Sequence, residues 1–413
     1  MRRRLPPVLQ QRDYALLWST LLVTALSAQM TAVAVGWQVY GLHRSAFDLG
    51  LIGLAEFVPL PLLALPAGHL ADRFPRRLVF AGSLLVETAV PALLLVVTIS
   101  HVHALWPYLA LAVATGGGSA LGSPAARALF PELVQPDLLA GAMALRSIAG
   151  QAAVVAGPAV GGLLFAVRPE IVYATATGLF AVGFGCMLAL RTPRTVRGEE
   201  PAPGLASVLA GIRFIRRTPV MLGAISLDLF AVLFGGAVAL LPLFARSILH
   251  TGPVGLGVLR SAPAIGALVA GVMLARRPLR GSAGRTLLVV VAVFGSSMVV
   301  FGTSRWFAVS LVALAVSGFA DMISMNIRSL TVALATPDAL RGRVNAVEMV
   351  FISASNELGA FESGVAAALM GAMPAVVAGG ALTIAIAAIW GRLFPPLARV
   401  DRLEELHPDW ETA

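Results

Sequence analysis

Six carboxylates lie inside long apolar stretches of this sequence. They are Glu56, Glu87, Asp228, Asp321, Glu357 and Glu362, and Gln29 and Asn356 add uncharged polar groups to the same stretches. An ionisable side chain is costly to bury in an apolar helix, so each acid is a candidate for a functional site. A carboxylate in such a place can take up and release a proton, or it can contact a cationic ligand. The alternative is structural neutralisation by an arginine, with Arg127 and Arg328 as candidates.

Three of these acids are the ones that we expect to carry a proton or to contact a cationic substrate: Glu87, Asp228 and Glu362. Glu87 and Glu362 lie near the middle of their apolar stretches. Glu357 and Glu362 are five residues apart, which places them about 140° apart around a helix. We therefore do not expect those two to act as one carboxylate pair.

The stretches that must position these groups are long enough to cross a membrane. Of the 413 residues, 58% are hydrophobic and only 12% are charged, too few charges for a soluble domain of this size. A helix of about 20 apolar residues crosses ~30 Å of hydrocarbon, and the alternating pattern of a membrane barrel is absent. The sequence therefore predicts an all-α membrane protein with twelve spans, near 14–39, 48–70, 78–99, 104–126, 144–166, 170–190, 219–245, 253–275, 285–303, 306–327, 344–370 and 373–394.

The basic residues indicate how these spans are oriented. All 30 are arginines, and 25 of them lie at the N-terminus or in the segments that share its side of the membrane. Cytoplasmic loops carry such an excess, so both termini are predicted to be cytoplasmic. The net charge of +9 does not indicate nucleic-acid binding, because the charges are not gathered on one soluble face. The five arginines left on the other side are Arg44, Arg168, Arg246, Arg260 and Arg305.

The two halves of the chain resemble each other weakly. Residues 136–141 resemble residues 337–342 at an offset of 201, and Arg127 matches Arg328 at the same offset. A duplication of six spans with equal topology is one known plan for transporters. It predicts two six-helix bundles at 1–190 and 219–394, a linker at 191–218 and a tail at 395–413.

The linker divides into a proline-containing loop and an amphipathic segment. Its second part places apolar residues on one helical face and Arg213, Arg216 and Arg217 elsewhere. Such a pattern predicts a helix that lies on an anionic membrane surface, although a plain tether explains it as well. The residues of the apolar face are Leu205, Val208, Leu209, Ile212 and Ile215.

Residues 68–77, GHLADRFPRR, form the most specific motif of the sequence. Gly68 permits two helices to approach closely, and Asp72 at a helix end can pair with an arginine. The segment closely resembles the signature loop between spans 2 and 3 of the major facilitator superfamily, with Pro75 where the pattern has glycine. The resemblance implies a gating loop that includes Arg73, Arg76 and Arg77, in which Asp72 pairs with Arg341 or Arg343 and holds the cytoplasmic side shut. The alternative is a loop that only sets topology.

A second motif lies in the fifth span. Gly157, Pro158, Gly161 and Gly162 allow a kink and a tight helix crossing. This segment resembles the end of a motif that is typical of exporters in the same superfamily, and ordinary helix packing is the alternative.

The resemblance covers nearly the whole chain and is closest to the branch of enterobactin exporters and drug-efflux proteins, the transmembrane secretion effector type. It implies a monomeric, multi-pass protein of the bacterial inner membrane that exports small amphipathic or siderophore-like molecules in exchange for protons. An importer or facilitator on the same fold is the alternative. A membrane enzyme is disfavoured, because the sequence has no HExxH motif, nucleotide loop or Cys/His cluster, and no metal or cofactor is expected.

Overall fold

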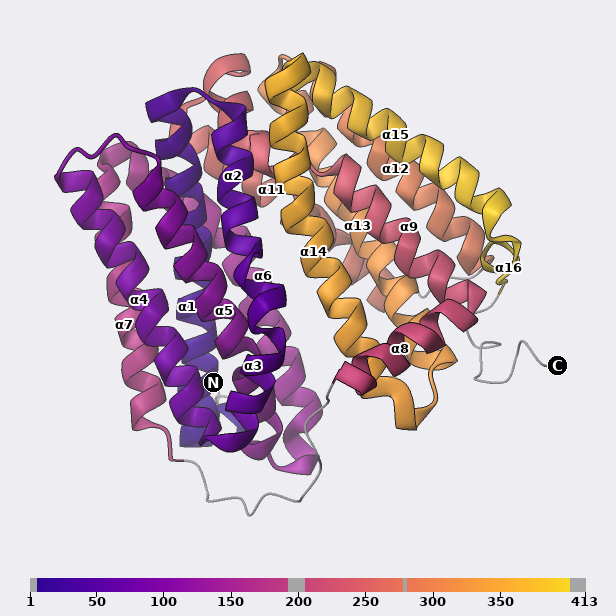
Figure 1. Ribbon diagram of the computed structural model, residues 1–413, viewed down its shortest axis with the longest axis horizontal. Helices are drawn as coiled ribbons and strands as arrows, with labels where there is room; N and C mark the ends of the chain where they lie inside the picture. The colour runs from indigo at the N-terminus through magenta and orange to yellow at the C-terminus, as the bar shows by residue number, and fades with distance from the viewer. Residues whose placement is uncertain (1–5, 192–204, 278–280, 402–413) are drawn as a thin grey trace, which may run out of the picture. The chain divides into compact units, whose positions relative to one another are not determined.

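The structure, a computed structural model, describes residues 6–191, 205–277 and 281–401. Within these ranges it is built of helices and turns, with no strand. The predicted all-α class is thus confirmed. The helices of the first half and the linker are α1 (Arg12–His43), α2 (Ala46–Phe57), α3 (Pro59–Arg73), α4 (Arg76–Ile99), α5 (Trp106–Glu132), α6 (Leu139–Val167), α7 (Pro169–Ala189) and α8 (Leu205–Arg217) (Figure 1).

The second half continues in the same manner after the linker helix. Short 3₁₀ segments lie at η1 (Pro7–Gln10) and η2 (Pro136–Leu138) in the first half and at η3 (Val238–Leu240) in the second, where η4 (Phe244–Ile248) is a π-helix. The remaining helices are α9 (Pro219–Gly235), α10 (Leu241–Leu243), α11 (Gly252–Arg276), α12 (Ala283–Thr303), α13 (Phe307–Ala335), α14 (Asp338–Met370), α15 (Ala372–Leu393) and α16 (Pro395–Ala398).

Ten helical segments in the described part of the chain are long and apolar enough to cross a membrane. The predicted fourth and eleventh spans are the long helices α5 and α14, which do not reach that apolarity. With 27 and 33 residues, both are nevertheless long enough to cross ~30 Å of hydrocarbon. The polarity of α14 comes from its six charged side chains: Asp338, Arg341, Arg343, Glu348, Glu357 and Glu362.

Two predicted spans are interrupted in the structure, although the sequence analysis treats them as continuous. The second span breaks at Val58, because Pro59 begins a new helix and has no N–H to donate to the preceding turn. The seventh span breaks after Gly235, where Gly236 is extended with a ψ of 119°. The chain then continues through η3, α10 and η4.

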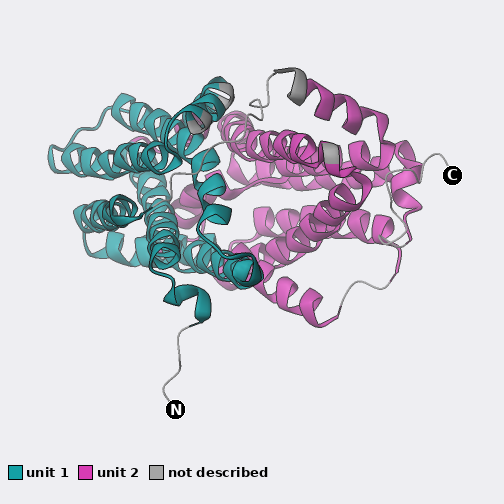
Figure 2. Ribbon diagram, turned by 90° about the horizontal axis from the view of Figure 1, so that it is seen from below, with its two compact units in different colours: residues 1–42, 55–202, 252–261 teal, residues 43–54, 203–251, 262–413 magenta. Residues whose placement is uncertain are grey.

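The helices group into two compact units (Figure 2). Unit 1 contains residues 1–42, 55–202 and 252–261, and unit 2 contains residues 43–54, 203–251 and 262–413. Each unit therefore includes one short segment from the other half of the sequence, which the predicted bundle boundaries do not anticipate.

Small residues explain why the start of α2 groups with unit 2. A Cβ atom added to Gly50 would lie 3.0 Å from the Phe361 carbonyl oxygen and 3.1 Å from the Cα atom of Gly364 in α14. The rings of Phe47 and Phe361 lie 6.2 Å apart beside this contact. Close backbone approach of this kind is what drives helix association where lipid removes the hydrophobic force.

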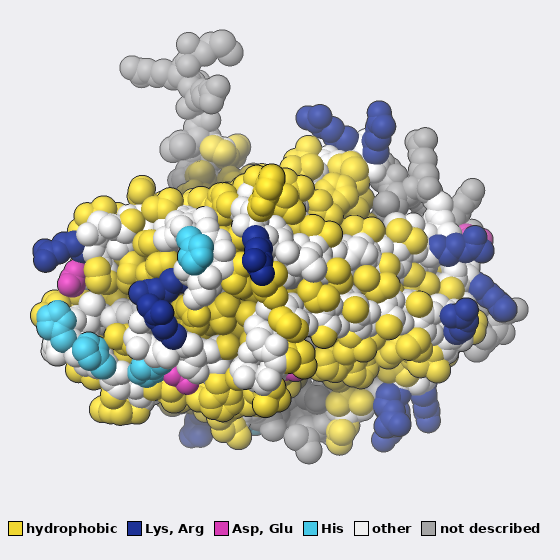
Figure 3. Space-filling view, turned by 90° about the horizontal axis from the view of Figure 1, so that it is seen from above, with side chains coloured by type: hydrophobic (Ala, Val, Ile, Leu, Met, Phe, Trp, Pro, Cys, Tyr) yellow, Lys and Arg dark blue, Asp and Glu magenta, His cyan; other side chains and the backbone are white. Residues whose placement is uncertain are grey.

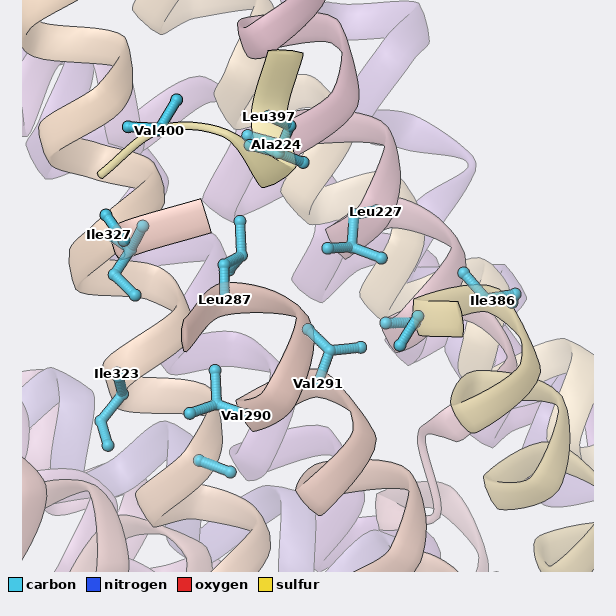
Figure 4. Close-up of a cluster of buried hydrophobic side chains, with 14 of the residues drawn as sticks. Ala224, Leu227, Leu287, Val290, Val291, Ile323, Ile327, Ile386, Leu397 and Val400 are labelled. Carbon is cyan, nitrogen blue, oxygen red and sulfur yellow. The ribbon is translucent and has the colours of Figure 1, made fainter. Parts of the chain in front are cut away.

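The core of unit 2 is an apolar cluster with members from α9, α11, α12, α13, α15 and α16 (Figure 4). Leu227 of α9 lies in this cluster with side chains of α12, α13 and α15. Its buried members include Leu287, Val290, Val291, Ile323, Ile327 and Ile386. Hydrophobic side chains also cover much of the face shown in Figure 3, where arginines and histidines occur in scattered groups.

The linker helix α8 packs on protein, and this corrects one expectation. Ile215 is 3% exposed and lies in an apolar cluster with Met221, Val344 and Val347, and Ile212 packs against the same cluster. Gly211 lies against the Arg343 backbone of α14, at 2.9 Å from a Cβ added at the glycine to the carbonyl oxygen. The inner part of the apolar face therefore covers unit 2 instead of facing lipid.

The rest of that face differs along its length. Leu209 is half exposed, while the side chains of Leu205 and Val208 lie outside the described residues. The three arginines, Arg213, Arg216 and Arg217, are exposed as predicted.

Candidate transport site

A buried ion pair is the best-defined charged site in the described part of the chain. Asp228 of α9 and Arg328 of α13 form this pair inside unit 2 and are 7% and 6% exposed. Arg328 is one of the two arginines that the sequence offers as a neutralising partner. Each charged residue follows a core residue, Leu227 or Ile327, so the helices place the pair at the border of the apolar core. Removing one partner would leave an uncompensated buried charge.

A third charged residue, Glu348 of α14, shares this site. It lines a small pocket together with Asp228, Arg328 and Ser355. The pocket has a volume of about 10 Å³, enough for roughly one water molecule. Glu348 interacts electrostatically with Arg328, although the two make no ion pair within 4 Å. Glu348 is not among the acids predicted from the sequence. Its position inside the predicted span 344–370 is the signal that could have identified it.

Glu87 of α4 is the main polar group of the other unit. The Ser119 hydroxyl of α5 donates a hydrogen bond of 3.5 Å to its carboxylate. Gly118 makes room for this contact, because a Cβ atom there would lie 3.2 Å from the Cγ atom of Glu87. The glycines at 116–118 therefore serve packing of α5 against α2, α3 and α4. Glu87 itself is half-buried and has no arginine partner within 4 Å among the described residues.

Three predicted site residues lie on α14 away from the ion pair. Glu362 is half-buried beside Ser363, whose hydroxyl donates a 2.6 Å hydrogen bond to the Gly236 carbonyl at the break after α9. Asn356 is exposed and donates to Ile352 of its own helix at 3.0 Å. Glu357 is half-buried and faces the start of α2, with an oxygen 3.7 Å from a Cβ added at Gly53.

The remaining predicted polar residues are not gathered with these groups. Asp321 of α13 is half-buried and has no hydrogen bond or ion pair with another described residue. Gln29 of α1 packs against Gly157. Glu56 lies near the end of α2, where its backbone lies against Gly116. The eight predicted residues are therefore spread over both units.

The gating-loop residues make contacts within their own units. Arg76 pairs with Glu132 of α5 at 2.6 Å, and Arg77 donates to the Leu190 carbonyl. Arg73 is exposed at the end of α3. On α14, Arg343 is exposed and Arg341 pairs with Asp338 at 2.7 Å.

The predicted partner of this loop is not tested, because the Asp72 side chain lies outside the described residues. Among the described residues nothing lies within 4 Å of a Cβ added at Gly68. The close helix approach expected at Gly68 therefore stays a prediction.

The glycines of the 157–162 motif do make tight contacts inside unit 1. A Cβ added to Gly161 would lie 2.9 Å from the Cα atom of Met30 in α1. One added to Gly162 would lie 3.1 Å from the Cα atom of Gly257 in α11. The Ser261 hydroxyl of α11 also donates to the Val155 carbonyl at 2.7 Å. This motif joins α6 to two helices at backbone distance.

A polar cluster near the ends of α1 and α4 is absent from the predictions. The Gln38 amide donates to the Thr98 hydroxyl at 3.1 Å, and the Tyr173 hydroxyl donates to the Gln38 carbonyl oxygen at 2.7 Å. Tyr108 is buried, and its hydroxyl has no hydrogen-bond partner among the described residues. The cluster ties three helices of unit 1 together.

Comparison with known proteins decides the family. The family described as transmembrane secretion effector, a group of major facilitator transporters, matches residues 5–410. The chain belongs to this family. As the sequence predicts, the family and its relatives are transporters and not enzymes, and this transmembrane secretion effector is a multi-pass membrane protein.

Two curated relatives illustrate the range of similarity. The enterobactin exporter EntS of Shigella boydii serotype 18 is 27% identical over 376 residues, which are 86% of this chain and 83% of EntS. The uncharacterized MFS-type transporter YfiS of Bacillus subtilis is 25% identical over 218 residues. The alignment covers 49% of this chain and 50% of YfiS, so the chain matches only half the length of that relative.

Solved structures share the fold. A point mutant of the nucleoside transporter NupG has a TM-score of 0.73 and 12% identity, covering 92% of this chain and 99% of NupG. A D-xylose-proton symporter has a TM-score of 0.71 and 12% identity, with 94% and 99% coverage. The predicted major facilitator fold is therefore confirmed.

Proposed function

We propose that this transmembrane secretion effector is a proton-driven exporter of small amphipathic molecules in the bacterial inner membrane. It works as a monomer, with both termini in the cytoplasm. The observation that carries the proposal is the buried Asp228–Arg328 pair with the half-buried Glu348 beside it, in a chain that aligns with an enterobactin exporter over 86% of its length. Intramembrane charges mark proton relays and substrate paths.

Proton coupling requires a group whose charge changes during the transport cycle. In alternating access, one six-helix bundle rocks against the other and presents a midplane site to each side in turn. An acid buried in the spans takes up a proton from one side of the membrane and releases that proton to the other side. The site carries substrate out of the cytoplasm in one half-cycle and carries the proton inward in the other. The proton gradient therefore drives export.

The gating loop at 68–77 supplies the second requirement, a reversible closure. We assign Asp72 to a pair with Arg341 or Arg343 that closes the cytoplasmic side. A charge swap tests this assignment: Asp72→Arg combined with Arg341→Asp or Arg343→Asp should restore the transport that Asp72→Arg removes. Failure of both swaps would contradict the pairing.

Transport into everted membrane vesicles tests the proposed function. The probes are enterobactin, measured by mass spectrometry, and ethidium, measured by fluorescence. An acid interior should drive accumulation of at least one probe above its outside concentration, and a protonophore should abolish it. Vesicles from cells that lack the protein provide the control.

Two other results would contradict the proposal. Equilibration without accumulation would indicate a facilitator. Accumulation that occurs only in right-side-out vesicles with an acid exterior would indicate a proton-coupled importer, the other activity expected of this fold.

A further inference from the structure

We infer that Glu348 is the proton-binding residue of unit 2, and that the neighbouring Asp228–Arg328 pair sets the charge of its surroundings. This inference deepens the proposed function, because it names the residue through which protons would couple to export. Glu348 is absent from the six acids that the sequence singles out. Three different helices, α9, α13 and α14, contribute one charged residue each to the site.

The count of charges at the site is uneven. Asp228 and Glu348 can carry two negative charges, whereas Arg328 carries one positive charge. A net negative charge in a site that is largely withdrawn from water is costly unless it is paired or neutralised. Binding one proton makes the cluster neutral, and the cluster therefore has a physical reason to exchange a proton.

The geometry assigns that proton to Glu348 and not to Asp228. Asp228 forms the direct ion pair with Arg328 and is 7% exposed, so its charge is satisfied. Glu348 is half-buried and forms no ion pair or hydrogen bond with another described residue. It lines a pocket that admits about one water molecule, and a water there is in place to pass a proton to its carboxylate. The proton leaves hydronium, bonds to a carboxylate oxygen of Glu348, and returns to water when the site opens elsewhere.

The other charged residues around α14 do not share the pocket of Glu348. The helices packed against α14 are α8, α9, α13 and α15, with η3 and the start of α2. The exposed arginines of α8 and Arg392 of α15 face solvent, and η3 carries no titratable group. Asp48 of α2 is already paired with His43 at 2.7 Å. Other charged residues lie on these helices or on α14 itself, outside the pocket. They are Arg213, Arg216, Arg217, Arg392, Asp48, Glu56, Asp321, Asp338, Arg341, Arg343, Glu357 and Glu362.

Infrared difference spectroscopy of the purified protein tests the inference without requiring transport. A pH titration of the wild type should show the C=O band of a buried protonated carboxylic acid. Glu348→Gln should remove that band, and Glu348→Asp should shift it. Asp338→Asn is the matched control, because it removes an exposed acid from the same helix and should leave the band unchanged.

Two spectroscopic outcomes would overturn the inference. One is a band that persists unshifted in both Glu348 variants, and the other is a band that disappears in the Asp338→Asn control. Because Glu348→Asp retains a carboxyl group, it keeps the test decisive if Glu348→Gln does not fold.

Transport then tests the link to coupling. With ethidium as the probe, we compare pH-driven accumulation with counterflow exchange, which moves no net proton. Glu348→Gln should lower the ratio of the two rates about tenfold or more, the scale of a coupling free energy. An unchanged ratio would overturn the inference. Absence of pH-driven accumulation in the wild type would instead contradict the proposed function, and the infrared band would still decide whether Glu348 binds a proton.

Discussion

Unit 1 and unit 2 contain related helices but differ in their buried charges. Arg127 and Arg328 occupy matched positions 201 residues apart, yet the residue matched to Glu348 at that offset is Ser147. In unit 2 the arginine lies between two acids, whereas the main acid of unit 1, Glu87, is held by a serine hydroxyl on α5. The matched arginine therefore has a second acid beside it in unit 2, where the matched position of unit 1 holds a serine.

The largest expected effect comes from breaking the buried pair of unit 2. Asp228→Asn removes the direct ion-pair partner of the buried Arg328, and such losses cost about 3–5 kcal/mol. The double variant Asp228→Asn with Arg328→Gln removes both charges and should recover most of that loss. Thermal unfolding in detergent, followed by size-exclusion chromatography, measures both. Additive losses in the double variant would show that the pair does not stabilise unit 2.

The second effect concerns the packing of unit 1. Gly116→Ala places a Cβ atom against the Glu56 backbone and should cost about 1–3 kcal/mol through overpacking. Gly117→Ala is the matched control, because its Cβ would lie 3.8 Å from the nearest atom, in Leu63. Thermal unfolding should separate the two variants clearly. Equal melting temperatures would contradict the close contact between α2 and α5.

A smaller effect is expected at Glu87, and it tests the difference between the two units directly. If Glu87 contacts the cationic part of a substrate, Glu87→Gln should weaken ethidium binding by about tenfold, equal to about 1.4 kcal/mol. The buried carboxylic acid band assigned to Glu348 should remain. Fluorescence titration of the purified protein measures the binding. Loss of the infrared band in this variant would mean that Glu87 of unit 1, and not Glu348 of unit 2, binds the proton.

The smallest effect is expected from the exposed pair of α14. Arg341 and Asp338 lie 2.7 Å apart, but their side chains are 52% and 88% exposed. Asp338→Asn should therefore change stability by less than about 1 kcal/mol, as is usual for surface pairs. The same thermal assay serves here. A loss as large as that of Asp228→Asn would mean that exposure does not separate the two kinds of pair.

Much of the fold follows from the sequence alone, because the length of an apolar run determines whether a helix can cross a membrane. Partners are harder to predict, since apolarity does not say what a helix face meets. The sequence pattern places the apolar face of α8 on lipid for this reason, although Ile215 packs on protein. Residues 43–54 group with unit 2 because of contacts between Gly50 and Gly364, which only the folded chain brings together.

The candidate site is predictable only in part. Asp228 and its possible partner Arg328 stand out because charges in apolar spans are rare. Glu348 does not, because it lies only five residues after Arg343 and belongs by sequence to the charged start of α14. Its role depends on α9 and α13 meeting α14 at one level, and no pattern along a single helix contains that information.

The packing of α8 has a practical consequence for dividing this protein into fragments. A cut between residues 191 and 205 gives a C-terminal fragment that keeps α8 over Met221 and Val347. A cut after Arg217 removes α8 from the C-terminal fragment and exposes the apolar cluster around Met221 and Val347 to water. Co-expressed fragments should consequently reassemble when divided at the first position and aggregate when divided at the second.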